Sequence, residues 1–187
     1  MVVKMKKVFA FLADGLEEVE ALMVIDLLRR THKIDVTMVS ITGNEIVTGS
    51  HNIKIIADEV ISNIDFEEGD MIFLPGGMPG TLNLGECAVL TDNIVEYNKK
   101  GKKLAAICAA PSVLGQLGVL SGKNATCYPG FEDKLTGAIY KGESVATDAN
   151  VTTANGLGSA LELGLELIRV LVDEESSEQV AKAIQYK

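Results

Sequence analysis

Three short apolar runs constrain the fold of this chain more than any other feature of its sequence. They lie at residues 7–12, 70–74 and 103–107, and glycine-containing turns follow the first two. Near-continuous apolar runs of this length are typical of strands that are covered on both faces, as in parallel sheets. Segments with helical patterns separate the runs, so the chain is predicted to be an α/β protein. We expect a doubly wound, mostly parallel sheet with helices on both faces.

Weaker patterns predict the remaining elements. Asp14 and Glu17 resemble a capping box, in which an acid at the helix N-cap is followed three residues later by a glutamate. Gly101 is expected just beyond the end of a helix, where glycine is favoured. The predicted helices cover residues 14–30, 88–100, 111–117, 159–172 and 176–184. The further predicted strands cover residues 35–40, 124–126, 144–147 and 151–154, with a hairpin within residues 45–60.

The composition limits the classes of protein to which the chain can belong. Its 187 residues suffice for one full core, so residues 1–187 are expected to form a single domain. The 26 acidic and 17 basic residues give a net charge of −9, which disfavours nucleic acid or an anionic membrane as a partner. No apolar stretch approaches the about 18 residues of a membrane-spanning helix. The three cysteines show neither a disulfide framework nor metal-ligand spacing, so a cytoplasmic protein without metal or cofactor is expected.

Cys108 lies in the segment that says most about chemistry, Ala-Ala-Ile-Cys-Ala-Ala-Pro at residues 105–111. Small residues surround the cysteine, and Pro111 suits the first turn of a helix. A strand that turns sharply into a helix exposes the turn side chain and directs backbone N–H groups toward it, as in a nucleophile elbow. A helix N-terminus also lowers the pKa of a thiol, so we expect Cys108 to titrate below an ordinary cysteine. The alternative is a buried structural cysteine, which is the role expected for Cys87 and Cys127.

Three glutamates follow the first predicted strand. The favourable charge of an acid near a helix N-terminus explains Glu17 and Glu18. Glu20 differs, because Val24 and Leu27 continue its stripe as apolar residues that face the sheet. A carboxyl on that stripe needs a polar partner or keeps its proton. A protonated Glu20 would then donate a hydrogen bond to a nearby thiolate or transfer a proton during a reaction.

A glycine-rich turn, Leu-Pro-Gly-Gly-Met-Pro-Gly, covers residues 74–80. It is explained either as a simple tight turn or as a loop whose backbone N–H groups, at Gly76 and Gly77, approach a reacting oxygen. The acidic, glycine and cysteine turns all lie at the carboxyl ends of predicted strands. Because ligands of doubly wound sheets bind at those ends, the three turns are the candidate sites.

Together, residues 12–20, 74–77 and 105–111 resemble the ThiJ/PfpI superfamily. The similarity is closest to its DJ-one branch, which contains the Parkinson-disease protein and its bacterial relatives. The order and the spacing of the three motifs agree with the family over nearly the whole chain. The resemblance implies a flavodoxin-like domain related to the class I glutamine amidotransferases, and commonly a homodimer.

The resemblance also implies roles for individual residues. Cys108 would be the nucleophile and Glu20 its acidic partner, while the amides of Gly77 and Ala109 would be oxyanion donors. Gly76 belongs to the same binding turn.

The chain departs from the family pattern at one position. Many relatives have a histidine after the cysteine strand, where this chain has Tyr128. His32 and His51 fall near a helix end and in a hairpin turn, and neither place suits a catalytic triad. A protease or amidase reaction is therefore not expected, whereas a dyad of Cys108 and Glu20 remains.

Two functions of different classes remain open. The first, implied by the branch, is a cofactor-independent enzyme with glyoxalase or deglycase activity, whose substrate is a small reactive carbonyl compound. Cys108 would add to an aldehyde carbon, and Glu20 would move the proton. The second is a non-enzymatic oxidative-stress sensor or redox-linked chaperone, in which Cys108 is oxidised to sulfenic or sulfinic acid. The same reactive thiol serves both functions, so the sequence does not separate them.

Overall fold

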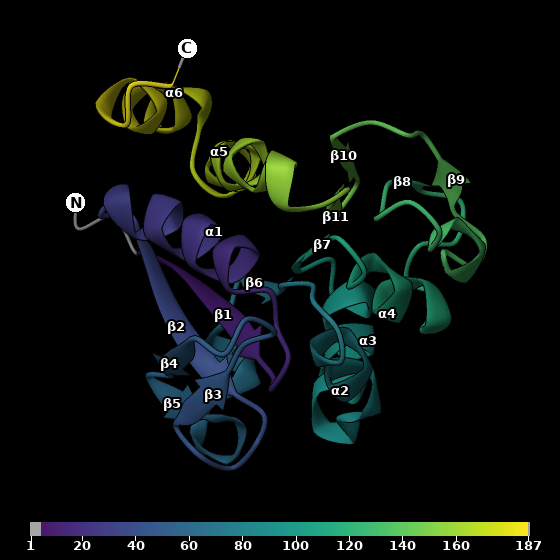
Figure 1. Ribbon diagram of the computed structural model, residues 1–187. Coiled ribbons are helices and arrows are strands. Elements are labelled where there is room, and N and C mark those ends of the chain that lie inside the picture. Colours follow the sequence, from purple (N-terminus) through teal and green to yellow (C-terminus); the bar gives the residue numbers. More distant parts are fainter. Residues whose placement is uncertain (1–4, 187) are drawn as a thin grey trace.

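Strand β1 (Lys6–Leu12) lies inside a seven-stranded sheet in the computed structural model of the chain (Figure 1). Its side chains alternate between the two faces: Val8 and Leu12 belong to one apolar cluster, and Phe9 and Phe11 to the other. Both faces are covered, so both sets of side chains must be apolar. This explains why the strand appears in the sequence as a continuous apolar run.

The strand order brings three distant segments of the chain side by side. The structure describes residues 5–186. The sheet runs β10 (Val145–Asp148), β11 (Val151–Ala154), β7 (Lys103–Ile107), β6 (Met71–Leu74), β1, β2 (Ile34–Ser40), β5 (Glu59–Val60). All neighbouring pairs in this sheet are parallel except β10 and β11. Two small sheets accompany it: the hairpin β3 (Ile46–Thr48) and β4 (Lys54–Ile56), and the pair β8 (Asn124–Ala125) and β9 (Ile139–Tyr140).

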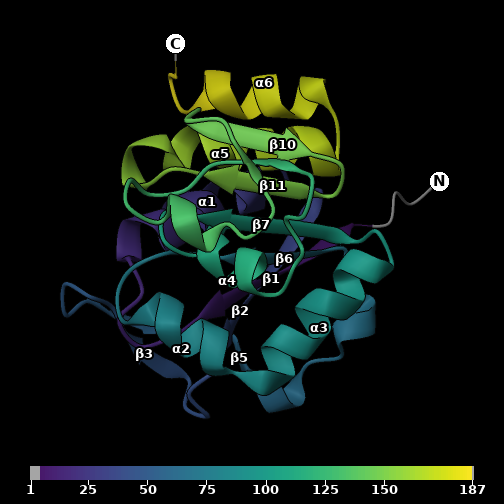
Figure 2. The same ribbon diagram turned by 90° about the vertical axis from the view of Figure 1, so that its right-hand side faces the viewer.

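Helices cover both faces of the seven-stranded sheet, and in Figure 2 one of the two helical layers lies in front of it. One apolar cluster joins the sheet to α1 (Glu18–Arg30), α5 (Ala160–Leu171) and α6 (Glu174–Ala183), with α6 packed against α5. The other joins it to α2 (Gly80–Glu86), α3 (Ala88–Lys99) and α4 (Pro111–Gln116). The short 3₁₀ turns are η1 (Ile61–Asn63), η2 (Phe66–Glu68), η3 (Glu132–Lys134) and η4 (Leu157–Ser159). The predicted α/β, flavodoxin-like, doubly wound and mostly parallel architecture is therefore confirmed.

The capping box predicted at Asp14 is wrong. Helix α1 begins at Glu18, and its N-cap is Glu17, whose side chain accepts a hydrogen bond from the backbone N–H of Glu20 at 2.7 Å. The Asp14 carboxylate instead accepts a hydrogen bond from the backbone N–H of Thr48 in the β3–β4 hairpin, at 2.8 Å. The acid that the local pattern assigned to the helix N-cap therefore bonds to a distant segment instead.

Helix α2 is the one α-helix of the described residues that the sequence does not predict. It begins at Gly80, directly after Pro79, and contains a second glycine at position 85. Such residues usually indicate a loop, but Leu84 is fully buried against the sheet and supports this short helix. Within residues 5–186, no helix has both the length and the apolar character needed to cross a bilayer.

The three turns with candidate site residues meet at one edge of the sheet. Strands β7, β6 and β1 are direct neighbours, and all three are parallel. Their last residues are Ile107, Leu74 and Leu12. The turns that follow these residues therefore leave the sheet side by side, at the edge where doubly wound folds bind ligands.

Two helical glycines provide a matched test of the packing around α4. A Cβ atom at Gly115 would overlap the carbonyl oxygen of Lys134 and lie 2.8 Å from Cα of Leu135, so it meets backbone that cannot rotate away. A Cβ atom at Gly85 would meet nothing closer than Val113 Cγ2 at 3.6 Å, an ordinary contact. We expect Gly115→Ala to destabilise the protein by about 1–3 kcal/mol. Gly85→Ala should leave the stability unchanged or raise it by up to about 1 kcal/mol.

Urea denaturation of both variants and of the wild type measures these changes. Equal stability of the two variants would contradict the tight packing of α4 against the η3 segment.

Candidate active site

Cys108 occupies a strained turn between β7 and α4. Its backbone φ is +64°, a left-handed conformation that residues other than glycine adopt infrequently. The backbone N–H of Cys108 donates to the carbonyl of Ala154 at 2.9 Å, and its carbonyl accepts from the N–H of Tyr128 at 2.8 Å. Pro111 is the first residue of α4, as predicted. The turn leaves the Cys108 side chain partly exposed at the carboxyl edge of the sheet.

Glu20 lies beside this cysteine and is almost entirely buried, with 1% of its surface exposed. Its carboxyl lies close enough to the Cys108 thiol and to the backbone N–H of Leu157 for both groups to lower its pKa. The backbone N–H of Gly76 donates a hydrogen bond to Oε2 of Glu20 at 3.1 Å. The predicted inward orientation of Glu20 is therefore present in the structure, and the side chains of the predicted pair are neighbours beside Gly76.

The glycine turn after β6 supplies two amides with different partners. The N–H of Gly76 donates to Glu20, whereas the N–H groups of Gly77 and Ala109 lie close enough to Cys108 to lower the pKa of its thiol. A Cβ atom at Gly76 would lie 2.5 Å from Glu20 Oε2 and 2.6 Å from Cys108 Cβ, so no side chain fits there. Gly76 thus allows the two side chains to approach, while the amides of Gly77 and Ala109 lie near the sulfur atom.

Burial is the main cause that raises the pKa of Glu20, to about 7. The negative charge of Glu17 raises it further, while the hydrogen bonds from Cys108, Gly76 and Leu157 act in the opposite direction. At neutral pH, both the protonated and the ionised form of Glu20 are therefore populated. This is the range in which a carboxyl group transfers protons well.

The expected low pKa of Cys108 is contradicted while Glu20 is ionised. Burial raises the pKa of the thiol to about 12, and the charge and the hydrogen bond of Glu20 contribute to the rise. The amides of Ala109 and Gly77 lower the pKa but do not compensate. The dipole invoked from the sequence is small, because α4 has only six residues. Once Glu20 is protonated, its repulsion disappears and its carboxyl can donate to the sulfur.

The positions of Tyr128, His32 and His51 relative to Cys108 decide whether a catalytic triad forms. The Tyr128 side chain is 51% exposed, and the hydrogen bond that ties this residue to the cysteine turn comes from its backbone N–H. Among residues 5–186, neither histidine forms a hydrogen bond with Cys108: His32 follows α1, and His51 bonds to Glu18. A triad with histidine is therefore not formed.

The other two cysteines lie in different surroundings. Cys87 joins α2 to α3 and is partly buried. Cys127 is fully buried, and burial, followed by the charge of Glu132, raises the pKa of its thiol to about 11. Neither thiol forms a hydrogen bond with Glu20 in the described part of the chain.

Two contributions to this site were not found from the sequence. The amide of Leu157 reaches Glu20 from the turn after β11, which carries no apparent signal. Glu18, interpreted as a surface charge of the helix, is 2% exposed and accepts a hydrogen bond from the N–H of His51 at 2.7 Å. The available signal was the position of Glu18, which directly precedes the apolar stripe of the helix and faces a polar hairpin turn.

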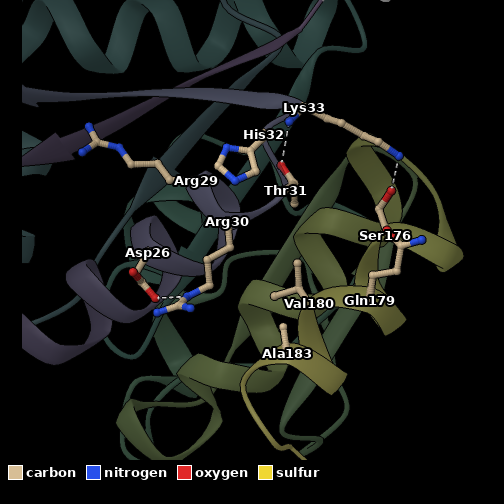
Figure 3. Close-up of a pocket in the computed structure, with 10 residues that line it drawn as sticks. All are labelled: Asp26, Arg29, Arg30, Thr31, His32, Lys33, Ser176, Gln179, Val180 and Ala183. Carbon is tan, nitrogen blue, oxygen red and sulfur yellow. Dashed lines mark hydrogen bonds and ion pairs between the residues drawn. The ribbon is translucent and has the colours of Figure 1, made fainter.

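The cavity of about 540 Å³ shown in Figure 3 lies elsewhere, between the end of α1 and helix α6. Its charged side chains are largely paired: Arg30 with Asp26, and Lys33 with the Ser176 hydroxyl at 2.8 Å. It contains neither member of the dyad, and no cysteine lines it. The chemistry of the three sequence motifs therefore belongs to the carboxyl edge of the sheet and not to this cavity.

This fold, with a cysteine at a strained strand–helix turn beside a buried acid, defines a class of flavodoxin-like proteins. A sequence model of the DJ-1/PfpI family matches residues 6–170. The chain belongs to the DJ-1/PfpI family.

Individual relatives are similar over most of this chain. Protein DJ-1 homolog B of Arabidopsis thaliana is 38% identical over 178 residues, which cover 94% of this chain but only 40% of the plant protein. The glutathione-independent glyoxalase DJR-1.2 of Caenorhabditis elegans is 29% identical over 173 residues, or 91% of each chain. The solved structure of oxidized Toxoplasma gondii DJ-1 superimposes with a TM-score of 0.93 at 36% identity, covering 97% of this chain and 98% of the other.

Substitutions at Glu20 test its hydrogen bond to the sulfur. Glu20→Gln keeps a neutral donor beside Cys108, and Glu20→Leu keeps none. Because a donor stabilises the thiolate, we expect the apparent pKa of Cys108 to be about one unit lower in Glu20→Gln than in Glu20→Leu. The rate of iodoacetamide alkylation against pH, with the modified cysteine identified by mass spectrometry, measures it. Equal values in the two variants would rule out a stabilising donor at position 20.

The raised pKa of Glu20 predicts a pH-dependent stability. The folded protein favours the protonated carboxyl, so this stabilisation is complete below the unfolded value near 4.5 and is lost as the pH rises toward 7. In a Cys108→Ser background, the protein with Glu20 should lose on the order of 3 kcal/mol relative to Glu20→Gln between pH 4.5 and pH 8. Urea denaturation across this range measures the difference, and a constant difference would contradict the raised pKa.

Proposed function

We propose that this protein is a cysteine-dependent enzyme that acts on small reactive carbonyl compounds, with glyoxalase- or deglycase-like activity. The observation that carries the proposal is the position of Cys108 beside the buried Glu20, with the amides of Gly77 and Ala109 near the sulfur. The name of the Caenorhabditis elegans relative, a glutathione-independent glyoxalase, supports it at the level of the family.

In the first step, the reactive form carries the proton on Glu20 and the negative charge on the sulfur of Cys108. The sulfur adds to the aldehyde carbon of a 2-oxoaldehyde, a C–S bond forms, and the electron pair of the C=O bond moves to the oxygen. Glu20 protonates this oxygen and becomes a carboxylate, giving a hemithioacetal. The amides of Gly77 and Ala109 favour the thiolate before the addition, and as the proposed oxyanion donors they then stabilise the negative charge that forms on the oxygen.

In the second step, the Glu20 carboxylate removes the proton from the former aldehyde carbon and returns it to the neighbouring carbon. The electron pair passes through an enediol, so one carbon is oxidised and its neighbour reduced without an external electron acceptor. Water then hydrolyses the thioester to a 2-hydroxy acid and frees Cys108. A carboxyl with a pKa near 7 is suited both to give and to take this proton.

An alternative function uses the same cysteine: Cys108 would be an oxidation sensor or part of a redox-linked chaperone. The partial exposure of Cys108 favours its oxidation over that of the buried Cys127. The similar Toxoplasma gondii structure is that of an oxidized DJ-1. We further propose one domain over residues 1–187, a homodimer and a cytoplasmic location, with neither nucleic acid nor membrane as a partner.

Turnover of methylglyoxal by the purified protein tests the enzyme. We expect measurable formation of lactate, its loss in Cys108→Ser, and a reduction of roughly 10²–10⁴ in Glu20→Gln, as is typical when a general acid–base is removed. Cleavage of amide or peptide substrates is not expected, because a poor amine leaving group needs a proton donor such as the absent histidine.

Tyr128→Phe is the matched control. It removes only a hydroxyl from an exposed ring beside the cysteine turn, and most of the turnover should remain. Loss of turnover in Tyr128→Phe would show that the tyrosine has taken the role of the histidine found in relatives. No turnover in the wild type, together with peroxide oxidation confined to Cys108, would favour the sensor instead.

A further inference from the structure

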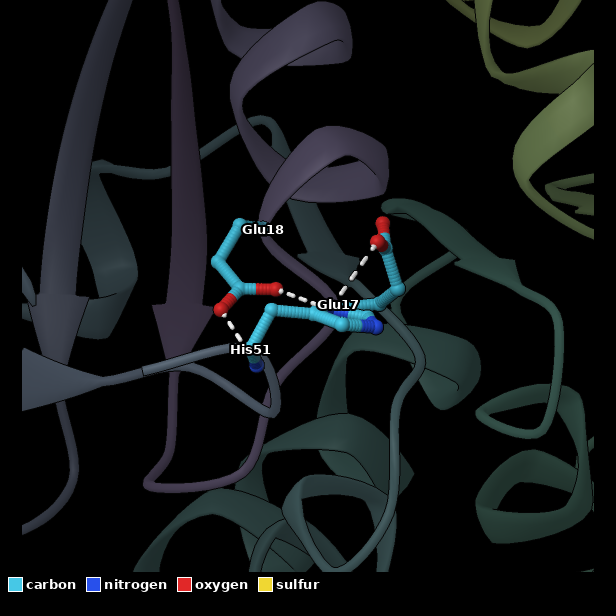
Figure 4. A group of neighbouring side chains, drawn as sticks. All are labelled: Glu17, Glu18 and His51. Atoms are coloured by element: carbon cyan, nitrogen blue, oxygen red, sulfur yellow. Dashed lines mark hydrogen bonds and ion pairs between the residues drawn. The ribbon is translucent and has the colours of Figure 1, made fainter. Parts of the chain in front are cut away.

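A second group of ionisable side chains lies next to the candidate active site. Figure 4 shows Glu17 and Glu18 at the start of α1, facing His51 in the turn of the β3–β4 hairpin. The Nδ1 atom of His51 lies 2.9 Å from Oε2 of Glu18 and 3.8 Å from Oε1 of Glu17. One imidazole therefore contacts two carboxylates.

Backbone bonds hold the hairpin turn against the helix start. The N–H of Ser50 donates to the carbonyl of Leu16 at 2.8 Å, and the N–H of Gly15 donates to the carbonyl of Thr48 at 2.8 Å. The N–H of His51 adds a bond to Oε1 of Glu18 at 2.7 Å. These bonds fix the position of His51 relative to the two acids, although 69% of its side chain is exposed.

Glu17 connects this group to the dyad. Its Oε2 atom accepts the backbone N–H of Glu20 at 2.7 Å, so its charge lies close to the acid that contacts Cys108. After burial, the charge of Glu17 is the largest of the causes that raise the pKa of Glu20. A cation that pairs with Glu17 must weaken this effect, because the field of a neutral pair falls off faster than that of a single charge.

We propose that His51 is a positioning residue of the site: its imidazolium pairs with Glu17 and Glu18 and partly cancels the charge that Glu17 presents to Glu20. The inference rests on the proposed role of Glu20 as the proton-transferring group. It adds a histidine that acts through Glu17 and touches neither Cys108 nor substrate. The charged groups involved are Glu17 and Glu18 facing His51, and Glu17 and Cys108 facing Glu20.

The protonation of His51 makes this effect depend on pH. The hydrogen bond to Glu18 and then the charge of Glu18 raise the pKa of His51, so the imidazolium persists toward neutral pH. Removing the imidazolium leaves Glu17 uncompensated and favours the neutral form of Glu20. We therefore expect His51→Gln to raise the pKa of Glu20 by about 0.3–0.5 unit at low ionic strength.

The ¹³C chemical shift of the Glu20 carboxyl, followed by NMR against pH, tests the inference without any need for turnover. His51→Arg is the matched control, because it keeps a cation at this position at every pH. The rise should occur in His51→Gln, be absent in His51→Arg, and shrink in 1 M NaCl, since the exposed pair is screened. It should also vanish when Glu17→Gln is added to His51→Gln and compared with Glu17→Gln alone.

Three outcomes would overturn the proposal: a pKa of Glu20 that is the same in His51→Gln and the wild type, an equal shift in His51→Gln and His51→Arg, or a shift that survives in the Glu17→Gln background. An equal shift would show that His51 only holds the hairpin in place, and the melting temperature of each variant measures that structural role separately. Absence of methylglyoxal turnover would reject the proposed function while leaving the titration of Glu20 to decide the role of His51.

Discussion

The backbone of Cys108 is the constraint on which the rest of the site depends. A left-handed φ at a residue with a side chain costs about 1–3 kcal/mol, and it persists only where the surroundings fix it. Here the N–H group is held by Ala154 of β11 and the carbonyl by Tyr128. The turn separates the thiol from the strand and presents it to a carboxyl from one neighbouring turn and to an amide from another.

The second requirement is the strand order. Because β7, β6 and β1 are adjacent and parallel, segments nearly one hundred residues apart end at the same edge of the sheet. The sheet then shields Glu20 from water, and this burial sets its proton affinity near neutrality. The covering of the sheet that stabilises the protein thus also raises the pKa of the carboxyl beside the sulfur.

The sequence predicts the architecture well, because buried parallel strands leave uninterrupted apolar runs and helix α1 leaves a clear stripe. The inward position of Glu20 follows from that stripe. The sequence does not predict which acid caps α1, since Asp14 bonds to Thr48, 34 residues away. The predicted direction of the pKa shift of the Cys108 thiol is also wrong, because helix polarity is visible in a sequence whereas desolvation is not. Glu18 and Leu157 contribute through tertiary contacts that no local pattern encodes.

The close approach of the glycine turn to the start of α1 limits how this site can be re-engineered. A Cβ atom at Gly80 would lie 2.6 Å from the N atom of Leu16, and one at Gly77 would lie 2.5 Å from its carbonyl carbon. The two loops touch through bare backbone, so a mutant library that varies these glycines would mostly yield misfolded protein. Met78, Tyr128 and Leu157 belong to the surrounding turns and have side chains that are 45%, 51% and 47% exposed. Directed evolution toward bulkier or more polar substrates should therefore randomise these three exposed positions and keep the glycines unchanged.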